Sequence, residues 1–322
     1  MKDRFVVAVD IGGTSYRVVL ADANANIINR IAEPTRSWES HETGLERINE
    51  TINQVASVVG LEKVMGIAVC AGGPLNPQTG VLLTPPSLSG WRNVPVKATF
   101  EEAFQIPVWV ENDADLAVLG EQRFGAGKGC DRLIYITVST GIGGGIIVDG
   151  EILRGVDLSI AEIGHIVVDP NGPRCNCGGK GHVETLSSGT AIARIAGERI
   201  SEGATSKLQQ TCEGDLSKIT GEMVVNAARE GDLLANQILQ SAGSYLGMAI
   251  ASLIHLFDPQ VVIIGGGISN AGELILEPAR KTLSKYSMAD YRGRARVVQS
   301  ELGDNSGIMG AIAFGWDKLK TV

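Results

Sequence analysis

Short apolar runs separated by glycines and polar residues open the chain, a pattern typical of buried strands joined by tight turns. Residues 5–9 form the first run, which leads into a glycine turn at 10–14. Because further apolar runs follow directly, the chain begins with a meander of strands and not with a strand–helix–strand unit. In the first part of the chain we expect strands at 5–9, 16–21, 27–32, 64–70 and 108–110, and helices over 43–59 and 113–124.

The opening pattern recurs from Leu133. A strand at 133–137 leads into a second glycine turn at 139–145, and a returning strand at 146–148 follows. This order repeats that of the first residues and indicates a coarse internal duplication. Later we expect a buried helix over 238–253, a strand at 261–264 that ends at the glycine run 265–267, and a terminal helix over 306–318.

The duplicated pattern predicts an α/β protein of two domains. No proline- or serine-rich linker separates the halves, so we expect the domains to pack around a cleft. The expected division is a small domain at 1–114, completed by the C-terminal helix at about 305–322, and a large domain at 115–304.

Composition narrows the class of protein. The 322 residues are 44% apolar and carry a net charge of −8, which argues against disorder and against nucleic-acid or membrane partners. Five cysteines, an odd number, argue against a disulfide framework, and the first 30 residues show no leader pattern. We therefore expect a cytoplasmic protein. The 41 glycines exceed the usual share of roughly 7%, so we expect many of them at turns or ligand contacts.

The two N-terminal glycine turns lead into strands, which excludes the dinucleotide-binding fingerprint. The segment 125–129 lacks the hydroxyl residue and spacing of a P-loop. Each turn instead carries a hydroxyl residue, Thr14 or Thr140, beside glycines whose exposed N–H groups suit a phosphate. Asp10 precedes the first turn and is placed to hold magnesium directly or through water. The alternative is that both turns are ordinary tight hairpins.

Two cysteines and two histidines lie within 18 residues, a set that suits tetrahedral zinc. Glycines between them allow the loop to wrap tightly, and we expect no helix around it. Incidental histidines beside inert thiols are the alternative. The expected ligands are His165, Cys175, Cys177 and His182.

Three carboxylates are candidates for substrate chemistry. Glu162 and Glu184 flank the zinc cluster and are placed to accept hydrogen bonds from sugar hydroxyls, although each alone would be read as a solvated surface residue. Asp113 follows the strand 108–110 beside Asn112, at the strand end where ligands collect in α/β sheets. It could accept a proton from an attacking hydroxyl, or simply be a helix N-cap.

Together these segments resemble the ROK family of sugar kinases and repressors, within the actin-like ATPase superfamily. The resemblance runs from residue 5 to about 316, and the segment 161–189 is its most specific part. The matching segments are VDIGGT (9–14), ENDADLAVLGEQRFGAGKG (111–129), TVSTGIGGG (137–145), AEIGHIVVDPNGPRCNCGGKGHVETLSSG (161–189) and VVIIGGGIS (261–269).

The resemblance implies an actin-like ATPase (ribonuclease H-like) fold and an ATP-dependent hexose kinase that uses Mg²⁺ and a structural Zn²⁺. It implies that Asp113 is the general base and Asp10 the magnesium-associated acid. It implies sugar contacts at Gly73, Ser87, Asn112, Asp113, Glu162, His165 and Glu184, with His165 also binding zinc. It implies phosphate or nucleotide contacts at Gly12, Gly13, Thr14, Thr140, Gly141 and Gly266.

Of three departures from the family pattern, one bears on the zinc site and two bear on the substrate. His182 stands where the family has a third cysteine, so a Cys2His2 zinc set is expected. Ser87 replaces an asparagine of many family glucokinases, and the sugar-facing segment 70–74 lacks the usual Pro-Gly-Pro. The interpretation is a glucokinase forming a homodimer or tetramer, with mannose, fructose, N-acetylmannosamine or N-acetylglucosamine as alternative acceptors. A repressor is disfavoured because only nine residues precede Asp10.

Overall fold

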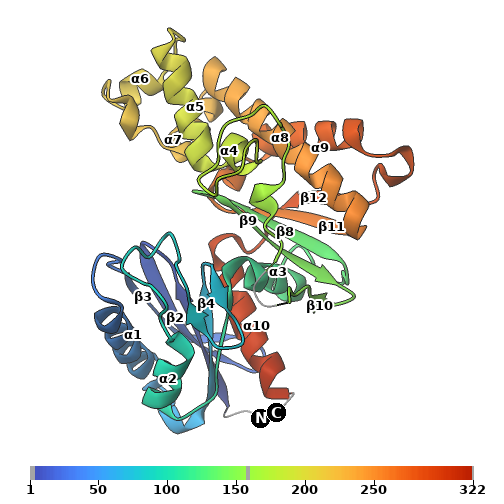
Figure 1. Ribbon diagram of the computed structural model, residues 1–322. Coiled ribbons are helices and arrows are strands. Elements are labelled where there is room, and N and C mark those ends of the chain that lie inside the picture. Colours follow the sequence, from blue (N-terminus) through green and yellow to red (C-terminus); the bar gives the residue numbers. More distant parts are fainter. Residues whose placement is uncertain (1–3, 157–159, 321–322) are drawn as a thin grey trace. The chain divides into compact units, whose positions relative to one another are not determined.

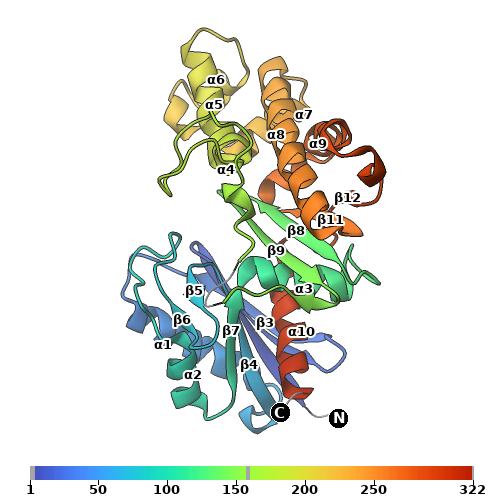
Figure 2. The same cartoon turned by 45° about the vertical axis from the view of Figure 1, so that its right-hand side comes forward.

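The computed structural model describes residues 4–156 and 160–320 (Figures 1 and 2). Its contacts divide the chain into two compact units, each a five-stranded sheet with helices. Unit 1 comprises Met1–Lys128, Ile152–Ile160 and Asn305–Val322, and unit 2 comprises Gly129–Glu151 and Ala161–Asp304.

Unit 1 is a sheet with helices on both faces (Figure 1). Side chains alternate along β1, so Val7 and Val9 pack with helices α1 and α2, whereas Val6 and Ala8 pack with α3 and α10. The strand order is β3-β2-β1-β4-β7, with β1 antiparallel to β2 and parallel to β4. Its main elements are β1 (Phe5–Ile11), β2 (Ser15–Asp22), β3 (Ile27–Pro34), α1 (His41–Ala56), β4 (Val64–Ala71), β5 (Leu75–Asn76), β6 (Val81–Leu82), α2 (Val96–Phe104), β7 (Val108–Asn112), α3 (Asp113–Phe124) and α10 (Ser306–Lys320).

Unit 2 repeats this strand order as β10-β9-β8-β11-β12, with β8 antiparallel to β9 and parallel to β11. The internal duplication expected from the sequence is therefore present in the topology. Helix α8 packs closely along α9, because Gly243 and Gly247 let the α9 backbone approach. The elements are β8 (Leu133–Val138), β9 (Ile142–Val148), β10 (Glu151–Ile152), α4 (Glu184–Ser187), α5 (Gly189–Ser201), α6 (Leu208–Thr211), α7 (Gly221–Arg229), α8 (Leu233–Phe257), β11 (Val261–Gly265), α9 (Glu273–Tyr286) and β12 (Arg296–Gln299).

The second glycine turn is shorter than the sequence predicted. Strand β9 begins at Ile142, so Gly143, Gly144 and Gly145 lie within the ladder opposite β8. Glycine is needed there for a different reason, since a Cβ on Gly144 would lie 2.2 Å from the Ile163 side chain. The prediction of a turn over 139–145 was wrong for its second half.

The Cys/His segment also differs from expectation. We expected no helix around it, but the short helix α4 begins two residues after His182. A 3-10 turn, η2 (Ile163–His165), carries the first histidine.

Helix α3 belongs to unit 1, where it packs along α10. The predicted boundary at residue 114 would assign this helix to the large domain. Within residues 4–156 and 160–320, no helix is both long and apolar enough to cross a membrane.

Candidate functional site

Three parallel strands of unit 1 end at the same edge of the sheet. Their register aligns Asp10 of β1 with Cys70 of β4 and Glu111 of β7. Asn112 and Asp113 come next, where β7 passes into α3. The carboxyl ends of these strands therefore gather the acids that the sequence singled out, at the position where α/β sheets bind ligands.

Asp113 is the first residue of α3 and not its cap. Asn112 has extended backbone angles, and its carboxamide oxygen accepts hydrogen bonds from the N–H groups of Ala114 and Asp115. The N-cap alternative for Asp113 is therefore wrong. Asp113 keeps an exposed surface, and one of its carboxylate oxygens accepts a 2.8 Å bond from the Ala114 N–H.

Two effects raise the pKa of Asp113. Partial desolvation of its carboxylate by the surrounding protein atoms is the larger, and the negative charge of Asp10 adds to it, while backbone N–H donors oppose both. A raised pKa makes the carboxylate a better proton acceptor than an ordinary aspartate. Burial, and after it the negative charges of Asp10 and Asp113, raise the pKa of the Cys70 thiol well above its usual range, so Cys70 stays protonated.

Asp10 forms an ion pair with Arg17 of β2, which the sequence analysis did not find. The two residues lie opposite each other across the antiparallel β1–β2 ladder. Pairing the two expected strands across the glycine turn would have been the way to find this ion pair from the sequence. Both Arg17 contacts go to one carboxylate oxygen, Oδ2. One carboxylate joined by substrate phosphates and water is a usual magnesium arrangement, so Asp10 fits that role through its other oxygen.

Four of the predicted sugar contacts, Asp113 among them, lie close together in unit 1. A Cβ built on Gly72 would lie 3.7 Å from the Asp113 carboxylate and 3.9 Å from the Ser87 hydroxyl. A Cβ on Gly73 would lie 3.1 Å from Nδ2 of Asn112. The structure therefore groups Gly73, Ser87, Asn112 and Asp113 around the glycine pair that follows β4.

The first glycine turn touches this group. A Cβ on Gly13 would lie 2.5 Å from the Ser87 carbonyl oxygen, so the turn and the Ser87 segment are in backbone contact. The turn is closed by a hydrogen bond from the Gly12 N–H to the Ser15 carbonyl.

The four predicted zinc ligands of unit 2 converge. One ligand atom from each of His165, Cys175, Cys177 and His182 lies within 4.8 Å of the others. The two Nδ1 atoms are 3.3 Å apart, and each lies near a sulfur, 3.8 Å from Cys175 for His165 and 3.4 Å from Cys177 for His182. Tetrahedral zinc with ordinary bond lengths requires ligand separations of about 3.3 to 3.8 Å, so these three separations and the chemistry of the four donors fit the ion.

Glu184 and Glu162 lie beside this cluster. One oxygen of Glu184 accepts a 2.8 Å hydrogen bond from the Ile142 N–H and lies against Gly141 of the second glycine turn. The carboxylate of exposed Glu162 is 3.8 Å from Nε2 of His165. His165 therefore presents one nitrogen to the cluster and the other toward a carboxylate.

A pocket of about 610 Å³ in unit 2 extends from the second glycine turn. This volume suits a nucleoside. Thr140 lines it, but most of its wall comes from residues that the sequence analysis missed, between α5 and α7. Gly266 lies just outside it, in a left-handed conformation (φ 80°) against the Val138 carbonyl. The missed lining residues with polar or small character include Gly189, Thr190, Thr220, Gly221, Glu222, Asn226 and Arg229.

Comparison with known proteins gives consistent matches. The ROK family matches residues 6–317. The glucokinase of Thermotoga maritima is 37% identical, with 96% of each chain covered. A ROK glucokinase of Streptomyces griseus, solved with glucose and AMPPNP, superposes with a TM-score of 0.81 at 35% identity, covering 96% of this chain and 98% of that one. The xylose repressor of Bacillus subtilis is 30% identical over 96% of this chain but 76% of its own. The chain therefore belongs to the ROK family and has its actin-like ATPase fold.

Proposed function

We propose that this protein transfers the γ-phosphoryl group of ATP to the 6-hydroxyl of glucose. The observation that carries the proposal is Asp113, a carboxylate of raised pKa at the edge where β1, β4 and β7 end. The glucokinase relatives and the glucose complex of the Streptomyces griseus kinase support glucose as the acceptor.

In the proposed reaction Asp113 accepts the proton of the 6-hydroxyl as that oxygen bonds to the γ-phosphorus. The bond between the γ-phosphorus and the β,γ-bridging oxygen breaks, and ADP leaves with that oxygen. Positioning and electrostatic stabilisation supply most of the acceleration in such transfers. Asn112 commits its carboxamide oxygen to capping α3, which leaves Nδ2 to donate to a sugar oxygen.

Other residues bind the two substrates in this proposal. Sugar hydroxyls are bound by the group at Gly73, Ser87 and Asn112 and by Glu162, His165 and Glu184. Phosphates are bound by the N–H groups of the two glycine turns, at Gly12, Gly13, Thr14, Thr140 and Gly141, with Gly266 beside the nucleotide. The nucleoside occupies the pocket between α5 and α7, and Asp10 associates with the magnesium ion, which neutralises phosphate charge when bound.

We further propose that the Cys/His cluster holds a structural zinc. Two thiolates and two imidazoles close all four positions of a tetrahedral ion. The N–H of Gly179 donates to the Cys177 sulfur at 3.4 Å, as expected around a metal-bound thiolate. The family resemblance also underlies our proposal of a homodimer or tetramer, and the odd number of cysteines underlies our proposal of a cytoplasmic location.

A coupled assay of ADP release across glucose, mannose, fructose, N-acetylmannosamine and N-acetylglucosamine tests the function. We expect the highest kcat/KM with glucose. A change in acceptor preference would be expected from Ser87, which stands where many family glucokinases have asparagine. A higher kcat/KM with another sugar would make that sugar the acceptor. ADP release that no sugar stimulates would refute the kinase.

A further inference from the structure

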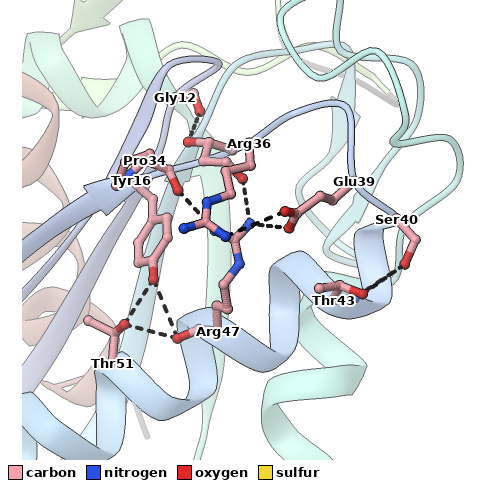
Figure 3. A network of polar contacts seen from close by, with 10 residues as sticks. Gly12, Tyr16, Pro34, Arg36, Glu39, Ser40, Thr43, Arg47 and Thr51 are labelled. Carbon is pink, nitrogen blue, oxygen red and sulfur yellow. Dashed lines mark hydrogen bonds and ion pairs between the residues drawn. The ribbon is translucent and has the colours of Figure 1, made fainter.

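Residues 34–39 run from the last residue of β3 toward the start of α1 and pass beside the first glycine turn. We call them the strap (Figure 3). Thr35, only 2% exposed, is the strap residue that meets the turn. Its hydroxyl donates to the Gly12 carbonyl at 2.6 Å, and its N–H donates to the Thr14 carbonyl at 3.0 Å. One residue therefore holds the carbonyls on either side of Gly13.

Fixing the Gly12 carbonyl also fixes the Gly13 N–H. The two groups belong to one planar trans peptide, in which the C=O and N–H bonds point in opposite directions. Because the carbonyl points to Thr35, the N–H of Gly13 points away from the strap. Among the described residues, none accepts a hydrogen bond from this N–H, so it remains available to a ligand.

Arg47 of α1 holds the strap in turn (Figure 3). Its guanidinium donates to the Thr35 carbonyl at 2.7 Å and to the Pro34 carbonyl at 3.2 Å, and it pairs with Glu39 at 3.0 Å. The backbone carbonyl of Arg47 accepts a 2.9 Å bond from Thr51. Tyr16 of β2 shares a hydrogen bond with that same hydroxyl, which anchors this part of α1 to the sheet.

We infer that Thr35 and Arg47 are positioning residues that aim the Gly13 N–H at the phosphates of the bound nucleotide. The inference rests on the proposed function for the identity of the ligand. The inferred arrangement requires a hydroxyl donor at position 35, which bonds the Gly12 carbonyl, and a guanidinium at position 47, which bonds the strap carbonyls. Neither residue touches the reacting atoms.

The test measures the affinity of Mg²⁺–AMPPNP by calorimetry and the KM for ATP. Thr35→Val keeps the shape but loses the donor, and we expect about tenfold weaker AMPPNP binding and a similar rise in KM. Thr35→Ser keeps the donor and should stay within about twofold of wild type. Glucose affinity without nucleotide should not change in either variant.

Arg47→Met should weaken AMPPNP in the same direction. Both substitutions act through the Gly12 carbonyl. The double variant should therefore bind AMPPNP no more than about twofold more weakly than the single variant with the lower affinity. Arg280→Met is the matched control. Arg280 of α9 likewise donates to a backbone carbonyl, that of Val297, and pairs with an acid, Glu273. The Arg280→Met substitution should lower Tm and leave AMPPNP affinity unchanged.

Wild-type AMPPNP affinity in Thr35→Val, or an equal loss of glucose affinity, would overturn the inference. If Thr35→Val does not fold, Arg47→Met against Arg280→Met carries the same comparison. A wild-type protein that binds AMPPNP but does not phosphorylate glucose refutes the proposed function alone. The affinities then still decide the role of Thr35 and Arg47.

Discussion

The two strand–turn–strand copies share a strand order but support their glycine turns with different groups. In unit 1 a buried threonine hydroxyl bonds Gly12, and an arginine from the following helix holds that threonine. In unit 2 the carboxylate of Glu184 bonds Ile142 at the end of the turn, and the Gly189 N–H bonds the Ser139 carbonyl. The side-chain group that bonds the turn directly is a neutral hydroxyl at the first turn and a carboxylate at the second.

This difference separates the tasks of the two copies. The first turn stands beside the acids at the strand ends, where a further negative support would raise the pKa of Asp113 still more. The second turn receives its carboxylate from the segment that follows the Cys/His cluster, so the proposed zinc site and the geometry of this turn are linked along the chain. The two copies share one architecture, but the proposed proton acceptor belongs to unit 1 and the proposed zinc site to unit 2.

The largest expected effect is loss of the proton acceptor. Asp113→Asn should lower kcat by about a thousandfold, because the amide accepts no proton, while glucose still binds. Steady-state kinetics and calorimetry check both parts. Asp149→Asn, at an exposed acid of the β9–β10 hairpin in unit 2, is the control and should keep wild-type kcat. Near-normal turnover in Asp113→Asn would show that Asp113 is not the proton acceptor.

A methyl group at each turn tests the comparison directly. In Gly13→Ala the new Cβ meets the Ser87 backbone oxygen at 2.5 Å, which cannot move without displacing the chain. In Gly141→Ala it meets the end of the flexible Glu184 side chain at the same distance. We expect kcat/KM to fall by about a hundredfold for Gly13→Ala and by less than about tenfold for Gly141→Ala. Equal losses would mean that both turns are equally constrained.

Removing the metal should affect unit 2 first. Cys177→Ser, or a chelator on the wild-type protein, should release one zinc per chain and lower Tm by about 5 °C or more. Elemental analysis and calorimetry check this. Cys212→Ala, which removes a buried thiol far along the chain from the cluster, should keep its zinc. A wild-type protein without stoichiometric zinc after metal-replete purification would contradict the site.

The smallest expected effect is a displaced pH profile. The carboxylate form of Asp113 is the active one, so kcat/KM should rise with pH through its raised pKa. Asp10→Asn removes a negative neighbour, which lowers the pKa of Asp113 and moves the acidic limb to lower pH. Activity itself will also fall, so the position of the limb is the readout. A limb that stays in place, or moves to higher pH, would show that Asp10 does not tune the base.

Much of the fold followed from the sequence because its signals were local. Apolar runs located β1, β4, β8 and β11, and the repeat of strand, turn and strand anticipated the duplicated topology. The same local signal failed at Gly143 to Gly145, because glycines that make room for Ile163 look like glycines of a turn. Cysteine and histidine spacing identified a set whose ligand atoms do converge.

The missed residues act through contacts between distant segments. Thr35 and Arg47 have no motif of their own, and their role depends on a loop that passes a turn more than 20 positions earlier. The pocket residues Glu222, Asn226 and Arg229 lie on α7. The apolar pattern of this helix shows which face is buried, but not that its polar residues line a pocket. Such roles need the register of the sheet and the path of the loops, which one sequence does not specify.

The contact between Gly13 and the Ser87 backbone has an evolutionary consequence. Any backbone shift of the Ser87 segment would press on the first glycine turn, and any side chain at position 13 would displace that segment. Under the proposed function, exchange of the side chain at position 87 can therefore change acceptor preference without moving the turn. Insertions or deletions around position 87 would move the turn, so we expect substrate diversification to follow single substitutions on an unchanged main chain.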